Sequence, residues 1–305
     1  MNFLPDGTQV TSERWTCSDN LRIAVNGYGR EKSVLTSDGN DFKPSWSRTG
    51  SLLTFFRALR YGASFADWKS KLCVIGADGT GFRELTTGEY ADFNPTWTRD
   101  GTNEIIFNRY AVGGSDRNDV YLIPPDGRIG DEVLVSNPQN RYEWAFSGLR
   151  DGRIFVDRVT WGSGAPVARS FLLTPSPGRI GVYEEIVRPT TRLWHKLSVS
   201  PSETKVAYML DLDDDMSTYQ DVVLCYADFD ARSRVVSNPV VFTEDDPNDI
   251  SEYPRWNADE TLVLYDSNRS GTYQMYAYRL ADRMTVRLSD GRSDAQFGNF
   301  ENLPK

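Results

Sequence analysis

Short runs of apolar residues recur along the chain, and polar segments that favour turns separate them. The runs 52–56, 72–75, 105–107 and 120–123 are examples, and the turn Pro-Pro-Asp-Gly at 124–127 follows the last of them. Short runs rich in β-branched and aromatic side chains are typical of strands, whereas helices need longer periodic stretches. None of the runs approaches the ~18 apolar residues that a membrane-spanning helix requires. The pattern therefore predicts an all-β chain without a membrane span.

A tryptophan motif places these runs in a long internal repeat. Residues 41–50 read Asp-Phe-Lys-Pro-Ser-Trp-Ser-Arg-Thr-Gly, and residues 92–101 read Asp-Phe-Asn-Pro-Thr-Trp-Thr-Arg-Asp-Gly. Weaker copies lie at 251–260, 194–203 and 143–152, and a fragment lies at 3–7. The tryptophan position, or its equivalent, falls at residues 3, 46, 97, 148, 199 and 256, so the steps are 43, 51, 51, 51 and 57 residues. Three equal steps through degenerate copies indicate a true repeat.

Each repeat contains four predicted strands, and this number decides the fold. A lone four-stranded sheet cannot bury both of its faces, whereas sheets that are arranged radially bury one another's faces. Six copies occupy the whole chain and leave no room for a second domain. We therefore predict a single domain over 1–305, an all-β six-bladed β-propeller of four-stranded antiparallel blades. The blades are expected at about 1–36, 37–86, 87–136, 137–187, 188–243 and 244–289.

The C-terminal tail, residues 290–305, is expected to close the ring. Residues 294–300 repeat the pattern that precedes the tryptophan in the second repeat, and the first repeat needs a strand of this type. We therefore expect residues 295–302 to pair with blade one, so that the ring is closed by the chain termini. Closure of this kind leaves no sheet edge exposed.

The Pro-x-Trp turn, the apolar strand after it and a closing Leu-Thr resemble the WD40-like (PD40) repeat of TolB-type β-propellers over essentially the whole chain. The resemblance implies that the tryptophan strand is innermost and the Leu-Thr strand outermost. It places the loops between second and third strands, with the connections between blades, on one face, here called the top face. The tight Asp-Gly turns then lie on the opposite, bottom face. Trp46, Trp97 and Trp256 are expected to pack between blades.

Composition narrows the classes of function. Lys and Arg number 34 against 43 Asp and Glu, which gives a net charge of −9 and argues against nucleic-acid binding. Cys17, Cys73 and Cys225 are too few and too widely spaced for a disulfide framework or a zinc site, so we expect free thiols. The N-terminus has no signal peptide, which predicts a cytoplasmic protein, or a periplasmic or secreted one if a signal was removed. We expect a monomer or a part of a larger assembly.

Acidic residues suggest Ca²⁺ as the one candidate cofactor. Asp41, Asp92 and Glu143 lie five residues before the tryptophan position, and Asp294 fills the same position if the tail closes the ring. Carboxylates that converge on one mouth of the channel could bind a hard cation; alternatively, each caps its own turn. A second acidic group, Asp211, Asp213 and Asp215, is either another calcium site or a solvated acidic surface.

His195 is the only histidine, and it is a candidate general base on the channel rim, with Tyr253 as the alternative base. The other interpretation of His195 is a structural, hydrogen-bonded residue. Arginines near the ends of second strands favour an anionic ligand. The predicted ligand-binding residues are Arg57, Arg60, Arg109, Arg158, Arg269, Trp161, Trp194, Glu143 and Glu252.

Two functions remain open from the sequence. The first, which we favour, is a non-catalytic TolB-like propeller that binds a protein, peptide or anionic glycan on its top face. The second is a carbohydrate-active enzyme, a polysaccharide lyase that cleaves an acidic polysaccharide by β-elimination. Oligogalacturonate lyases are similar to TolB-type propellers, but their metal centre relies on several histidines and this chain has one. The standard motifs of serine hydrolases, P-loop proteins and zinc proteases are missing.

Overall fold

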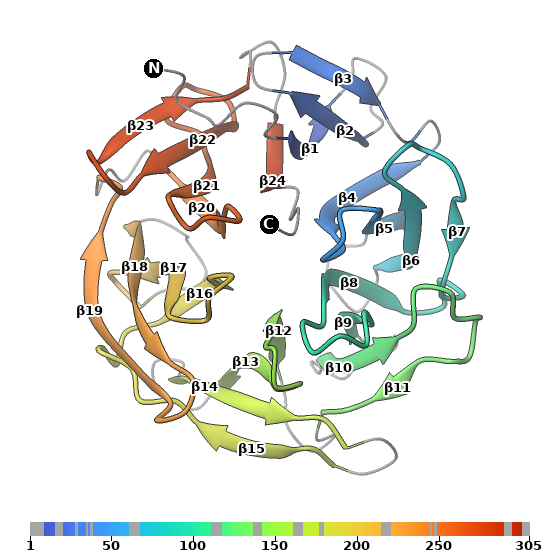
Figure 1. Ribbon diagram of the computed structural model, residues 1–305, viewed down its shortest axis with the longest axis horizontal. Coiled ribbons are helices and arrows are strands. Elements are labelled where there is room, and N and C mark those ends of the chain that lie inside the picture. The colour runs from blue at the N-terminus through green and yellow to red at the C-terminus, as the bar shows by residue number, and fades with distance from the viewer. Residues whose placement is uncertain are drawn as a thin grey trace.

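The computed structural model describes residues 9–15, 21–27, 30–34, 36, 39–60, 68–110, 118–136, 142–160, 167–176, 180–214, 221–244, 246, 249–289 and 295–300. In these ranges the chain forms a ring of six four-stranded antiparallel blades around a common centre (Figure 1). The architecture is the predicted all-β propeller. Within the same ranges, no helix is long and apolar enough to cross a membrane.

The blades follow one another around the ring in chain order. Blade I contains β24 (Ala295–Phe300), β1 (Gln9–Trp15), β2 (Leu21–Gly27) and β3 (Arg30–Val34). Blade II contains β4 (Asn40–Trp46), β5 (Leu52–Arg60), β6 (Lys69–Gly76) and β7 (Arg83–Glu84). Blade III contains β8 (Ala91–Trp97), β9 (Ile105–Tyr110), β10 (Asn118–Ile123) and β11 (Val133–Leu134).

The remaining three blades have the same plan. Blade IV contains β12 (Glu143–Gly148), β13 (Ile154–Thr160), β14 (Val167–Thr174) and β15 (Val182–Glu185). Blade V contains β16 (Trp194–Val199), β17 (Lys205–Asp211), β18 (Val222–Asp230) and β19 (Val235–Val241). Blade VI contains β20 (Ser251–Trp256), β21 (Leu262–Ser267), β22 (Gln274–Arg279) and β23 (Met284–Arg287).

The first strand of each repeat is innermost in the ring and the last is outermost (Figure 1). In blade I the inner strand is β24, from the C-terminal end of the chain, and it pairs antiparallel with β1. The pairing agrees with the strand expected from the sequence at 295–302. That this pairing holds the ring closed stays a prediction.

Tryptophans pack between neighbouring blades, as the repeat predicted. Trp97 of blade III is 5% exposed and packs with Leu72 and Val74 of blade II, and its Nε1 donates to Ser45 O at 3.0 Å. Trp256 of blade VI makes the equivalent bond to Ser198 O of blade V at 3.1 Å. In blades III and VI the inner strand is therefore anchored to the preceding blade by both an apolar contact and a hydrogen bond. The apolar contacts of Trp46 within the described ranges lie inside blade II.

Blades IV and V depart from the motif, and packing explains why. Gly148 occupies the tryptophan position of blade IV, where an added Cβ would come within 2.8 Å of the Thr98 Cα and the Trp97 carbonyl. Blade V has Val199 at this position, and Trp194, five residues earlier, fills the space between blades IV and V instead. Trp194 is fully buried against Phe155 and Tyr208. Trp194 thus packs between blades as Trp97 and Trp256 do, although it lies five residues earlier in its repeat.

Two of the cysteines lie inside blades as free thiols. Cys73 and Cys225 are buried in blades II and V, and burial raises the pKa of each thiol to about 12. Neither is suited to metal binding or nucleophilic chemistry at neutral pH, because the reactive form of cysteine is the thiolate. Cys17 lies outside the described residues.

Candidate functional site

A cavity of about 390 Å³ lies in the centre of the ring. Its walls are the second halves of the inner strands of blades II to VI and the turns that follow these strands. The cavity therefore belongs to the part of the channel nearer the bottom face. Among the described residues, five cationic side chains and no carboxylate line it; the cationic residues are Lys43, Arg48, Arg99, Arg150 and Arg255.

A β-bulge in each of these inner strands determines which side chains enter the channel. The pairing register shifts between Phe42 and Ser45 in blade II, and the equivalent shift occurs in blades III to VI. Bulge residues in four blades take left-handed backbone angles, which residues other than glycine seldom adopt. These residues are Lys43 (φ 51°), Asn94 (φ 54°), Lys196 (φ 50°) and Tyr253 (φ 54°).

The bulge side chains contact one another across blades. The Lys43 Nζ donates to Asn94 Oδ1 at 2.6 Å. Both Lys43 and Lys196 place their ammonium groups 4.5 Å from the centre of the Tyr253 ring, and Lys196 also pairs with Glu252. Tyr253, a candidate base from the sequence, therefore lies in the channel wall between two cations.

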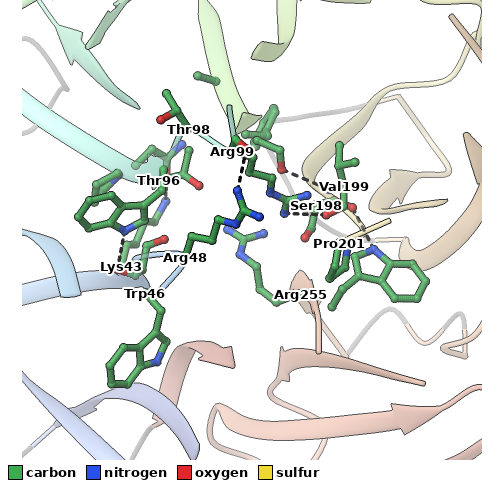
Figure 2. A pocket seen from close by; sticks show the side chains of 18 of the residues that line it. Lys43, Trp46, Arg48, Thr96, Thr98, Arg99, Ser198, Val199, Pro201 and Arg255 are labelled. Atoms are coloured by element: carbon green, nitrogen blue, oxygen red, sulfur yellow. Dashed lines mark hydrogen bonds between the residues drawn. The ribbon is translucent and has the colours of Figure 1, made fainter. Parts of the chain in front are cut away.

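The arginines come from two positions of the repeat. Arg48, Arg99 and Arg150 are each the second residue after the inner strand, and they are 51 residues apart. Arg255 is the next-to-last residue of β20. Arg48 and Arg150 are exposed, whereas Arg99 and Arg255 are half-buried. Figure 2 shows the side chains of Arg48, Arg99 and Arg255 directed toward one another in the middle of the cavity.

These arginines bond to backbone carbonyls and not to carboxylates. Arg99 crosses from blade III to blade V, where Nη1 donates to Ser200 O at 2.9 Å and Nη2 to Val199 O at 3.0 Å. The Arg150 Nη2 donates to Pro201 O at 2.7 Å, and the Arg255 Nη1 donates to Pro254 O at 3.0 Å. Within the described ranges, none of these side chains forms a salt bridge, so the cavity holds a surplus of positive charge.

Burial acts on the two deeper arginines. Loss of hydration lowers the pKa of Arg99, and the Arg150 and Arg48 charges lower it further, although Glu203 and Glu260 oppose them. Loss of hydration likewise lowers the pKa of Arg255. Both guanidinium groups remain charged at neutral pH, because arginine titrates far above it.

The predicted metal ligands have a different role in the structure. Asp41, Asp92 and Glu143 are each 1% exposed or less, because the side chains of an inner strand alternate between the faces of its blade and these faces pack on neighbouring blades. Each carboxylate lies directly opposite an arginine on the second strand; the pairs are Asp41–Arg57, Asp92–Arg109 and Glu143–Arg158.

These contacts are close, charge-assisted pairs. The Arg57 Nε and Nη2 donate to the two Asp41 oxygens at 2.7 and 2.9 Å, and Arg109 binds Asp92 in the same way at 2.6 and 3.0 Å. The Arg158 Nη2 lies 2.6 Å from Glu143 Oε1, and the Tyr183 hydroxyl donates to Oε2 at 2.6 Å. The sequence treated these acids and bases as separate ligand-binding groups, whereas they neutralise one another.

Aromatic rings pack on these arginines from the same blade. The Arg109 guanidinium lies 4.7 Å from the centre of the Tyr90 ring and 4.8 Å from that of Tyr121, and Arg158 contacts Phe171 and Tyr183 at 4.5 and 4.8 Å. In blade VI, Arg269 lies 3.3 Å from Asp249 and stacks on Tyr276. Arg60 and Arg269 are the exposed members of the predicted arginines. Arg57, Arg109, Arg158 and Arg269 each pair with a carboxylate of their own repeat.

His195 is not placed for catalysis. Its side chain is 8% exposed, and its Nε2 has no hydrogen-bond partner among the described residues. Burial, with the nearby Lys196 and Arg188 charges, lowers its pKa to about 3. A general base needs access to the substrate and a pKa near the working pH, so this geometry favours the structural interpretation of His195.

Two further candidates are engaged in the fold. Trp194 is a core residue and not the ligand contact that the sequence predicted, and its Nε1 donates to Ser170 Oγ at 2.7 Å. Glu252 is 8% exposed and forms the ion pair with Lys196. Trp161 lies outside the described residues.

The second acidic group organises a turn. Asp211 Oδ1 accepts hydrogen bonds from the backbone N–H groups of Asp213 (3.2 Å) and Asp214 (2.9 Å). The carboxylate therefore caps its own turn, which is a structural role and not metal binding. Burial and the neighbouring Asp213 carboxylate raise the pKa of Asp211. Asp215 and Asp294 are outside the described ranges, and within those ranges no group of three potential ligands could hold a metal ion.

The sequence did not identify the channel arginines as a group. Their signal was present, since Arg48, Arg99 and Arg150 occupy one position in three successive repeats. The repeat predicts a turn on the bottom face at that position, whereas the sequence predicts ligand binding on the top face. Arg255 has no such signal, because arginine does not recur at its position in the other repeats.

Comparison with known proteins identifies the fold. No known family model and no curated protein matches this sequence. A TolB from Acinetobacter baumannii superposes with a TM-score of 0.69 at 10% identity, over 96% of this chain and 66% of the other. The hydrazine synthase of Kuenenia stuttgartiensis superposes with a TM-score of 0.69 at 15% identity, over 98% of this chain and 47% of the other.

A chain of a nidogen/laminin complex superposes with a TM-score of 0.60 at 9% identity, over 98% of this chain and 100% of the other. This chain thus spans less than two thirds of the matched TolB and about half of the hydrazine synthase chain. The likeness establishes the fold, which is that of a TolB-like β-propeller.

Proposed function

We propose that this TolB-like β-propeller is a non-catalytic binding protein, and that it holds part of a protein, peptide or glycan ligand in the arginine-lined end of its channel. One observation carries the proposal: a cavity of about 390 Å³ is lined, in the part of the chain that the structure describes, by five cations and by no carboxylate. A cavity of this size is within the range of natural ligand sites. Its charge surplus is a cost that a bound ligand would offset.

The top face keeps its place in the proposal as a second contact area. Its loops at 61–67, 111–117, 161–166 and 215–220 lie outside the described residues, so the predicted binding there stays a prediction. A ligand whose charged end enters the channel from the bottom face needs none of these loops. Binding on the top face therefore requires these loops, whereas binding in the channel does not.

A panel of acidic peptides and uronate-containing glycans, with uncharged counterparts, tests the binding function by interferometry on the immobilised full chain. We expect saturable binding of at least one acidic probe and at least tenfold weaker binding by Arg255→Gln. Arg169→Gln removes a charge from a side chain that is 62% exposed, so it serves as the matched control. Binding that is equal in all three proteins, or absent with every probe, would contradict the proposal.

The lyase alternative has one observation in its favour. Tyr253 lies in a basic channel between Lys43 and Lys196, as a base that attacks an acidic polysaccharide would require. Acidic polysaccharides can be screened for the ultraviolet absorbance of an unsaturated product, with Tyr253→Phe as the inactive comparison. Product formed by the wild-type chain and lost in Tyr253→Phe would replace the binding function with this one.

A further inference from the structure

We infer that Arg48, Arg99 and Arg255 form a binding site for an oxyanion with two or more negative charges. This inference rests on the proposed function, because it specifies the ligand group that the channel holds. The shared chemistry is a cluster of carboxylate or phosphate oxygens. Neutral sugars and metal cations do not have it.

The first argument is convergence without compensation. The three side chains come from blades II, III and VI and point toward one another in the cavity (Figure 2). The Arg48 Nη1 lies 3.5 Å from the backbone carbonyl of Arg99, and the positive charge of Arg48 lowers the pKa of Arg99. Like charges in a partly dehydrated space repel, and an anion placed between them would remove the cost.

The second argument is the contrast with the arginines that are paired within the blades. Arg57, Arg109 and Arg158 each lie opposite a buried carboxylate in the strand register. Three of the six blades thus neutralise an arginine with a buried acid from the adjacent strand. The channel arginines have no such acid within the described ranges, which leaves the place of the acid to a ligand.

The two acids that act on Arg99 are held at the edge of the site, and Asp266 of β21 acts through space on Arg255. Glu203 Oε1 accepts a hydrogen bond from the backbone N–H of Arg150 at 2.6 Å, and Glu260 binds the backbone N–H and the hydroxyl of Ser202. Both act on Arg99 through space, and neither forms a salt bridge with it. Their bonds to the turns of blades IV and V keep the carboxylates out of the cavity wall.

The third argument is orientation. Carbonyls of blade V fix the Arg99 guanidinium through two of its five N–H groups, and Pro254 O takes one from Arg255. The remaining N–H groups are planar donors on side chains that are already held in position. Such donors suit the paired oxygens of a carboxylate or phosphate, which arginine binds in bidentate fashion.

Charge sets the valence of the ligand. Arg150 also lines this cavity, so its described lining contains four arginines and no acid. A single negative charge would leave most of this surplus in place. A cavity lined by one sign of charge also concentrates counter-ions of the opposite sign and repels cations. This cavity is therefore unsuited to a cation such as Ca²⁺.

Calorimetric titration with citrate, phosphate and succinate, each at an ionic strength held constant with NaCl, tests the site on the full chain. We expect one saturable site for citrate or phosphate, with the preference between them distinguishing a carboxylate ligand from a phosphate ligand. Arg255→Gln and Arg99→Gln should each weaken binding at least tenfold, and Arg169→Gln should leave it unchanged. Arg99→Gln also loses two bonds to carbonyls, so Arg255→Gln is the decisive variant if Arg99→Gln unfolds.

The outcomes separate this inference from the proposed function. No saturable binding of citrate or phosphate, or binding that Arg255→Gln leaves intact, overturns the oxyanion site, even if a macromolecule still binds elsewhere on the chain. Saturable binding that Arg255→Gln weakens supports the site, even if no peptide or glycan of the panel is captured. In that case only the proposed macromolecular ligand fails.

Discussion

Arginine has opposite environments in two regions of this propeller. Within blades II, III and IV, Arg57, Arg109 and Arg158 lie beside buried carboxylates and aromatic rings. In the channel, Arg48 and Arg99 lie among like charges and bond to carbonyls. In the first arrangement a carboxylate of the fold neutralises the arginine. In the second the positive charge remains for a ligand to neutralise. The hydrogen-bond partner of each arginine therefore indicates whether it stabilises the fold or is available for a ligand.

The largest expected effect on stability comes from breaking an arginine–carboxylate pair within a blade. Arg109→Gln removes the partner of Asp92, which is 1% exposed, and an unpaired buried carboxylate should lower the free energy of unfolding by about 3–5 kcal/mol. Burial already raises the pKa of Asp92 with Arg109 present, so the variant should also take up a proton on folding near neutral pH. Urea unfolding measures the loss. A loss below 1 kcal/mol would mean that the pair is not a structural one.

Asp157 offers the reverse case, a buried acid without a close cation. It is 2% exposed, and burial raises its pKa to about 6 against the hydrogen bond from Ser170. The native state therefore binds this proton more tightly than the unfolded state does, and stability that is present below pH 4 is lost as pH rises through about 6. The shift from 3.8 to about 6 corresponds to a loss of about 3 kcal/mol.

Asp157→Asn should remove this pH dependence, because the amide does not ionise. Unfolding measured from pH 4 to pH 8 should then give a flatter profile than the wild type, and the variant should be the more stable protein at pH 8. Identical profiles would mean that Asp157 ionises freely in the native state.

The smallest effect is expected in the channel. Arg255→Gln removes a half-buried charge that forms no salt bridge within the described ranges, so the free energy of unfolding without ligand should stay within about 1 kcal/mol of the wild type. Urea unfolding at low ionic strength, where screening is weak, gives the sharpest reading. A loss comparable to that of Arg109→Gln would erase the distinction between the two regions.

The sequence predicted the fold because its strongest signals are repeated ones. The motif around Trp46, Trp97 and Trp256 and the steps of 51 residues specify blades, and the fold follows from the need to bury both faces of each blade. Weak copies caused no error in blade number. Trp194 shows the limit of this approach, because packing moved the tryptophan by five positions and only the structure shows that it fills the same kind of space.

The candidate site was less predictable, for a reason that lies in strand register. The sequence singled out Asp41 and Arg57 but assigned them to different ligands; the structure pairs them because they are opposite one another on neighbouring strands. The bulges near Lys43 and Tyr253 then decide which side chains reach the channel. A bulge shifts the alternation by one residue, and the linear pattern does not record it.

Thermal unfolding with and without citrate, at constant ionic strength, tests the central claim most directly. A ligand that binds only the native state stabilises it by RT ln(1 + [L]/Kd), which is about 2.7 kcal/mol at a concentration of 100 Kd. We expect citrate to raise the melting temperature of the wild type and of Arg169→Gln, and to leave that of Arg255→Gln nearly unchanged. Equal shifts in all three proteins, or no shift in any, would contradict the claim that the channel arginines bind an anionic ligand.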